Sequence, residues 1–153
     1  MNKGYIAALV LLAGVTLCFA AERLVVKKVT PDGTLITSWH HRVRLAGIHL
    51  PGESAKGGRF EYYGHESVEA LKELVEGKEV TIDPIKSGWL FQRGRAYVFV
   101  DTVFINAYML RKGLARCNKK AGHRLAGEFA DYELSARKEK RGLWLSPFSA
   151  GRD

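Results

Sequence analysis

Two arginines stand in segments whose alternation of polar and apolar residues is typical of β-strands. Arg44 lies between Val43 and Leu45, and Arg93 opens the run 93–97 (RGRAY). A guanidinium group is planar and permanently charged, and its N–H groups match the spacing of phosphate oxygens. Two such groups held on rigid strands predict a clamp for phosphate.

The elements that would position these arginines can be read from hydrophobic periodicity and turn residues. Strands are expected at 23–29, 35–39, 42–48, 78–82 and 94–100, and helices at 64–77, 103–112 and 125–141. Pro31-Asp32-Gly33 is strong turn chemistry, so the first two strands form a hairpin. Five strands with one helix between the third and fourth are the order of an OB-fold barrel. We therefore expect an α+β fold, mainly β: a five-stranded OB-fold barrel with three helices.

The first twenty residues have the pattern of a secretory signal peptide. Lys3 precedes a weakly polar to apolar run at 5–20, and small residues follow at Ala20 and Ala21. The run is shorter than the roughly 20 apolar residues of a spanning helix. We expect residues 1–20 to be removed, leaving one domain at 21–153 that is secreted or periplasmic and not inserted in a membrane. The alternative is an uncleaved N-terminal anchor.

Charge and cysteine content limit the partners and the chemistry. The chain carries a net charge of +8, and loss of Lys3 with the leader would leave 23 basic and 16 acidic residues, or +7. This excess predicts affinity for nucleic acid or another polyanion, although ordinary solubility explains it equally well. Cys117 would be the one cysteine left, so an intrachain disulfide is excluded. A monomer is expected.

A series of short motifs in a fixed order resembles the staphylococcal (micrococcal) nuclease family over nearly all of residues 21–153. The motifs are Asp32-Gly33-Thr34-Leu35, Val43-Arg44-Leu45, Gly47-Ile48-x-x-Pro51, Tyr63-Gly64-x-Glu66-Ser67, Phe91-x-Arg93-Gly94-Arg95-Ala96-Tyr97, Asn106, Arg111-Lys112-Gly113-Leu114-Ala115 and Ala136-Arg137-Lys138-x-x-x-Gly142-Leu143-Trp144. The resemblance implies an OB barrel with three helices and, in active members, calcium-dependent cleavage of DNA and RNA.

The resemblance also assigns roles to residues. Arg44 and Arg93 match the two arginines that neutralise the phosphoryl oxygens and the leaving group. The first calcium carboxylate of the family corresponds to Gly33, and the second corresponds to His49. Calcium requires several oxygen ligands. Asp32 lies one residue too early, where its side chain is expected to point elsewhere.

The family carboxylate that positions the attacking water is also displaced. Gly52 occupies its position and Glu53 follows, in a glycine-rich loop that would let Glu53 swing into the site. His49, together with Asp32 or Glu53, would be a weak site for a transition metal instead. The aromatic residues Tyr62, Tyr63, Trp89 and Phe91 are candidates for stacking on bases, while Tyr63 and Phe91 would serve equally well as packing at the barrel rim.

Three functions remain open from the sequence. The first is an exported nuclease-family domain that binds nucleic acid or a phosphorylated polyanion through Arg44 and Arg93, with a degenerate calcium site. The second is an active divalent-metal endonuclease, with calcium as cofactor, in which Asp32 and Glu53 replace the shifted carboxylates. The third is an envelope protein-interaction module that keeps the barrel for stability.

Overall fold

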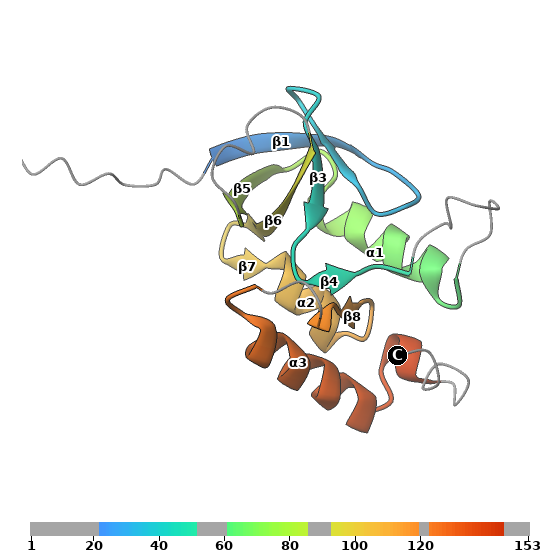
Figure 1. The fold of residues 1–153 in the computed structure, drawn as a ribbon. Helices are drawn as coiled ribbons and strands as arrows, with labels where there is room; N and C mark the ends of the chain where they lie inside the picture. Colours follow the sequence, from blue (N-terminus) through green and yellow to red (C-terminus); the bar gives the residue numbers. More distant parts are fainter. Residues whose placement is uncertain (1–21, 52–60, 86–92, 120–122, 146–153) are drawn as a thin grey trace, which may run out of the picture.

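Five strands of the chain close into a barrel, and three helices pack around it (Figure 1). The structure is a computed structural model that describes residues 22–51, 61–85, 93–119 and 123–145. The strands are β1 (Glu22–Val29), β2 (Leu35–Thr37), β3 (Arg42–Leu45), β4 (Ile48–His49), β5 (Glu79–Pro84), β6 (Arg93–Val100), β7 (Val103–Phe104) and β8 (Arg116–Cys117). The helices are α1 (Gly64–Val75), α2 (Ile105–Arg111), α3 (Ala126–Lys138) and the short 3-10 helix η3 (Gly142–Leu145).

The barrel is closed by one parallel strand pair. Strands follow the order β3-β2-β1-β5-β6 with antiparallel pairing between neighbours, and β3 then pairs with β6 in parallel. β7 continues the sheet beyond β6, while β4 and β8 form a separate two-stranded sheet. The predicted five-stranded OB-type barrel with three helices is confirmed.

The first hairpin forms where its turn residues predict it. Gly33 has a φ of 74°, a left-handed conformation that glycine adopts without steric cost. The turn is closed by the Gly33 N–H, which donates to the Thr30 carbonyl at 2.8 Å, and by the Thr30 N–H, which donates to the Thr34 carbonyl at 2.9 Å. This turn fixes the position of Asp32, between Pro31 and Gly33.

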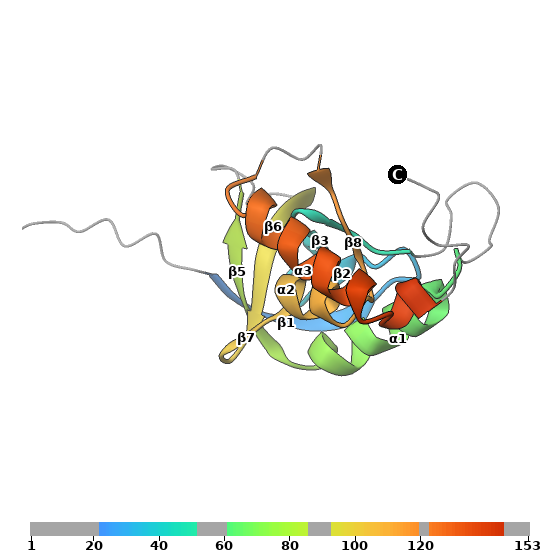
Figure 2. The same cartoon turned by 90° about the horizontal axis from the view of Figure 1, so that it is seen from below.

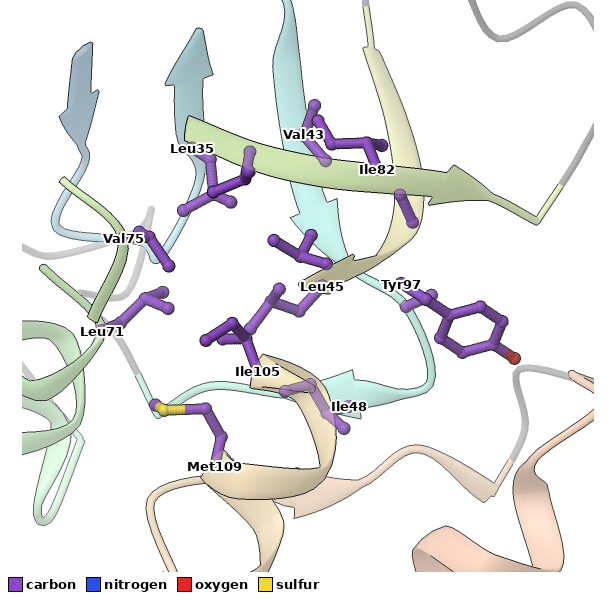
Figure 3. Packing of buried hydrophobic residues seen from close by; sticks show 14 of the residues in the cluster. Leu35, Val43, Leu45, Ile48, Leu71, Val75, Ile82, Tyr97, Ile105 and Met109 are labelled. Carbon is purple, nitrogen blue, oxygen red and sulfur yellow. The ribbon is translucent and has the colours of Figure 1, made fainter. Parts of the chain in front are cut away.

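The apolar core lies inside the barrel and continues under the first two helices. Figure 3 shows Leu35, Val43 and Ile82 of the strands in one buried cluster with Leu71 of α1 and Met109 of α2. All five side chains are completely buried. Burying a side chain of this size stabilises the fold by about 1.5–3 kcal/mol. The buried apolar residues of α1 are Val68, Leu71 and Val75, which recur at three- and four-residue steps. The periodicity that predicted the first helix is therefore confirmed.

Two of the predicted strands end earlier than expected. The strand predicted at 42–48 stops at Leu45, because Gly47 turns the chain with a φ of 71° and the next residues pair with β8 instead of β6. The strand predicted at 35–39 stops at Thr37, where a tight turn takes over.

Two of the predicted helices are also shorter than expected. The helix predicted at 103–112 begins at Ile105, because Val103 and Phe104 pair with β6 first. The helix predicted at 125–141 ends at Lys138, and the chain then turns into η3. In Figure 1, α3 lies on the side of α2 away from β1, and in Figure 2 it crosses in front of α2. None of the helices in the described ranges is long and apolar enough to cross a membrane.

Candidate nucleic-acid interface

The parallel pairing of β3 with β6 aligns four arginines. Arg42 lies opposite Arg93, and Arg44 lies opposite Arg95. Along β3 the side chains of Arg42 and Arg44 are exposed, while those of Val43 and Leu45 are buried. Residues directly opposite in a sheet share a face, so the exposed Arg95 lies on the same outer face of the barrel. We call Arg42, Arg44 and Arg95, together with the backbone position of Arg93, the arginine face.

Two of the sequence-predicted residues, Arg44 and Arg93, are therefore on neighbouring strands. Arg93 lies opposite Arg42, and Arg44 lies opposite Arg95, so Arg44 and Arg93 are offset by two residues along the strand pair. The side chain of Arg93 lies outside the described part of the structure. Within that part, neither Arg42 nor Arg95 forms an ion pair with a carboxylate. The positive charges of Arg42 and Arg95 therefore face solvent without an acidic partner there.

A buried asparagine holds the two strands in this register. Asn106 of α2 is completely buried, and its Oδ1 accepts the Val98 N–H at 2.9 Å. Its Nδ2 donates to the carbonyls of Ala46 and Ala96, at 2.9 and 3.2 Å. Ala46 lies two residues after Arg44, and Ala96 directly follows Arg95. Because Asn106 binds the backbone of β6 and of Ala46, the residue that directly follows β3, it helps to position the arginine face.

Asp32 contacts the arginine face directly. Its Oδ2 accepts a hydrogen bond from Arg44 Nη2 at 2.5 Å and one from the Thr34 hydroxyl at 2.9 Å. Its Oδ1 accepts the Thr30 hydroxyl and the Thr34 N–H, the latter at 3.4 Å. The turn therefore directs the carboxylate of Asp32 onto Arg44.

These contacts lower the pKa of the Asp32 carboxyl group. Partial burial by itself raises the pKa of its carboxyl group, but the hydrogen bonds from Thr30, Thr34 and Arg44 outweigh this and lower the pKa from 3.8 to about 2. Asp32 is therefore ionised at neutral pH and neutralises part of the charge of Arg44. Toward the described residues, Arg44 uses two of the five N–H groups that a guanidinium carries, one at Nη2 for Asp32 and one at Nε for Thr34.

His49 lies in a different set of contacts. Its Nε2 is 3.6 Å from Glu61 Oε1, and the other oxygen of Glu61 accepts a hydrogen bond from Arg116 Nη1 at 3.4 Å. The structure therefore pairs His49 with Glu61, a residue that the sequence reasoning did not single out. Glu53, predicted to position water or bind metal, lies outside the described residues, as do Trp89 and Phe91.

The described side chains do not fit a calcium ion. No three of the His, Cys, Asp and Glu side chains in the described ranges come together as a metal site would need. Both oxygens of Asp32 already accept two hydrogen bonds each, and one of the donors is the cation Arg44. Calcium at this carboxylate would have to displace that guanidinium, whereas calcium sites are built from several free oxygen ligands.

Sequence reasoning missed several residues of this surface. Arg42 and Arg95 are the clearest cases, because their place beside Arg44 depends on a pairing between strands that are far apart in the chain. The sequence did contain a signal: Arg42 and Arg44 alternate on one strand, as Arg93 and Arg95 do on the other.

Tyr63 was a candidate both for stacking on a base and for packing. In the structure it packs against the small buried cluster that contains Trp144.

Comparison with known proteins agrees with the fold and the motifs. Residues 42–146 match the family model described as "Staphylococcal nuclease homologue". The chain is 33% identical over 117 residues to "Probable staphylococcal-like nuclease CAN1" of Oryza sativa subsp. japonica, covering 74% of this chain and 32% of that protein. It is 36% identical over 108 residues to "Probable staphylococcal-like nuclease CAN2" of the same organism, covering 69% of this chain and 26% of that protein.

A fungal protein is a more distant relative. "Probable endonuclease lcl3" of Sclerotinia sclerotiorum is 23% identical over 131 residues, covering 77% of this chain and 47% of that protein. The matched region thus spans between about a quarter and about half of the length of these three relatives. The family model covers more than half of the chain, so the protein belongs to the staphylococcal nuclease family.

Proposed function

We propose that this nuclease-family domain binds nucleic acid, or another phosphorylated polyanion, through the arginine face and does so without calcium. The observation that carries the proposal is the register of β3 and β6, which sets Arg42 opposite Arg93 and Arg44 opposite Arg95. Phosphates follow one another along a nucleic-acid strand, so aligned arginines on two rigid strands can contact neighbouring phosphates. The net charge, +8 for the whole chain and +7 without residues 1–20, adds long-range attraction to the same partners.

Arg44 can take part although it is paired with Asp32. Beyond the bonds to Asp32 and Thr34, three of its five N–H groups have no partner among the described residues and can reach a phosphate. The ionised Asp32 beside it repels that phosphate, so the affinity contributed by Arg44 is lower than for an unpaired arginine. Arg42 and Arg95 carry no such penalty within the described residues, and we assign them the larger share of binding.

The proposal includes a calcium site that is degenerate. The residues at the family's three carboxylate positions are Gly33, His49 and Gly52, and the carboxylate that precedes Gly33, Asp32, is bound to Arg44. It also includes export, with residues 1–20 acting as a leader and the domain placed outside the cell or in the periplasm.

The second candidate is an active divalent-metal endonuclease. It is favoured by the printed names of the relatives, which describe a staphylococcal-like nuclease and an endonuclease. In this candidate Glu53 would orient the attacking water and Arg93 would stabilise the leaving group.

Cleavage and binding assays on the protein without residues 1–20 separate the candidates. Fluorescent single-stranded DNA, plasmid and RNA are incubated with calcium, manganese or EDTA, and retention is measured on the same samples. The proposed function predicts salt-dependent binding that EDTA does not change and that Arg44→Ala and Arg93→Ala weaken, with the polymers left intact. Degradation that EDTA abolishes, and that Glu53→Ala and Arg44→Ala lose, would establish the endonuclease instead. Absence of both binding and cleavage at low salt would leave the protein-interaction module.

A further inference from the structure

The most exposed large apolar side chain of the described residues is Trp39. Its relative exposure is 73%, although tryptophan is among the more buried residue types in folded proteins. The sequence pattern places Trp39 in a strand, but β2 ends at Thr37 and Trp39 lies in the turn that joins β2 to β3. A single exposed apolar residue needs no explanation by itself. Trp39 does need an explanation, because of the turn that carries it and the arginines that follow it.

The turn that carries Trp39 is tightly fixed. The His40 N–H donates to the Thr37 carbonyl at 2.9 Å, and the Thr37 N–H donates to the His41 carbonyl at 3.1 Å. The Ser38 N–H donates to the Val25 carbonyl of β1 at 2.8 Å, which ties the turn to a third strand. Thr37 is completely buried and its hydroxyl accepts the His41 N–H at 3.2 Å. The backbone that carries the indole is therefore already fixed, so binding a ligand needs no ordering of the turn.

The turn leads directly into the arginine face. Arg42 is the first residue of β3 and lies three residues after Trp39, which places their Cα atoms within about 10 Å of each other. Arg44 follows on the same exposed face of the strand. An exposed aromatic side chain near a row of cations is the arrangement by which proteins hold single strands: the cations contact the phosphates and the aromatic ring stacks on a base.

We propose that Trp39 stacks on an unpaired base of a single-stranded nucleic acid whose phosphates lie along the arginine face. This inference rests on the proposed function and narrows its partner class. In a duplex both faces of each base are already covered by neighbouring bases, so Trp39 gains no stacking partner there. A polyanion without bases, equally, would be held by the arginines alone.

The test compares ligands that share a phosphate backbone and differ in their bases. Fluorescence anisotropy at low salt in EDTA measures binding of a 15-nucleotide oligothymidine, an abasic strand of the same length and a blunt duplex. The proteins are wild type, Trp39→Ala, Trp39→Phe and the control Leu134→Ala, which removes an exposed apolar side chain of α3. Circular dichroism verifies that each variant is folded.

The inference predicts that Trp39→Ala weakens binding of oligothymidine about 5- to 100-fold and changes binding of the abasic strand less than twofold. Trp39→Phe should recover most of the loss, and Leu134→Ala should resemble wild type on all three ligands. An equal loss on the abasic strand, or no loss on oligothymidine, would overturn the role of Trp39 while leaving the proposed function standing. If the wild-type protein bound neither oligothymidine nor the abasic strand, both the role of Trp39 and the proposed function would be overturned.

Discussion

Replacing Asp32 with asparagine is expected to weaken the fold and strengthen binding at the same time. The carboxylate lies on Arg44, at 2.5 Å from Nη2, and its pKa is lowered from 3.8 to about 2. At full value this shift would correspond to roughly 2.4 kcal/mol of stability. The side chains of Asp32 and Arg44 are 32% and 55% exposed, so solvent screening reduces the expected loss in Asp32→Asn to about 1 kcal/mol at neutral pH.

The pH dependence of this loss follows from the direction of the shift. A carboxyl group whose pKa is lowered by folding stabilises the native state above about pH 4, and the contribution disappears as the pH falls through about 2. The difference in unfolding free energy between wild type and Asp32→Asn should therefore be present at pH 7 and vanish near pH 2. Urea titrations at a series of pH values measure it directly.

Binding should change in the opposite direction. By Coulomb's law, two unit charges about 6 Å apart repel each other by roughly 0.7–1 kcal/mol in a solvated site. If a phosphate binds Arg44 at about that distance from Asp32, removing the carboxylate charge should raise the affinity for an oligonucleotide about three- to fivefold. Asp131→Asn is the matched control, since it removes the same charge from an exposed position of α3. The reasoning would be refuted if Asp32→Asn bound no better than Asp131→Asn, or if its stability matched wild type at every pH.

Three further predictions concern the elements that hold the arginine face. Asn106→Ala removes three hydrogen bonds from a completely buried position and should lower the free energy of unfolding by about 3 kcal/mol in urea titration, with weaker polyanion binding; a loss below about 1 kcal/mol would argue against this role. Gly47→Ala should cost about 2 kcal/mol by the same measurement, because the new Cβ would lie 2.5 Å from the His123 ring at a φ of 71°; unchanged stability would contradict the close packing. Burial lowers the pKa of His123, so wild type should lose stability as the pH falls below about 6.5 and His123→Gln should lose less; parallel pH profiles would disprove this linkage.

The parts of the fold that depend on local chemistry were predictable from the sequence. The turn at Gly33 and the helix α1 were placed correctly, because a turn residue and a three- to four-residue period act within a few positions of the chain. The breaks at Gly47 and before Ile105 were not predicted. There, pairing with a distant strand overrides the local pattern, and no periodicity encodes which strand that is.

The candidate site was predictable only in part, for a related reason. Arg44 and Arg93 could be singled out because the residues around them alternate between polar and apolar. The alignment of Arg44 with Arg95, however, results from closure of the barrel between β3 and β6. The direction of Asp32 could not be judged by its position alone. A shift of one residue in a turn changes where the backbone points, and the hydroxyls of Thr30 and Thr34 then direct the carboxylate toward Arg44.

The most direct test of the central claim is a salt titration of oligonucleotide binding in EDTA, with Arg95→Gln compared to Arg23→Gln. Arg95 lies on the arginine face, whereas Arg23 is an exposed residue of β1 beside Glu79. We expect Arg95→Gln to weaken binding and to reduce the slope of log affinity against log salt by about 0.7 for a single strand, whereas Arg23→Gln should change the slope much less. Equal slopes for the two variants, or binding that appears only when calcium is added, would contradict it.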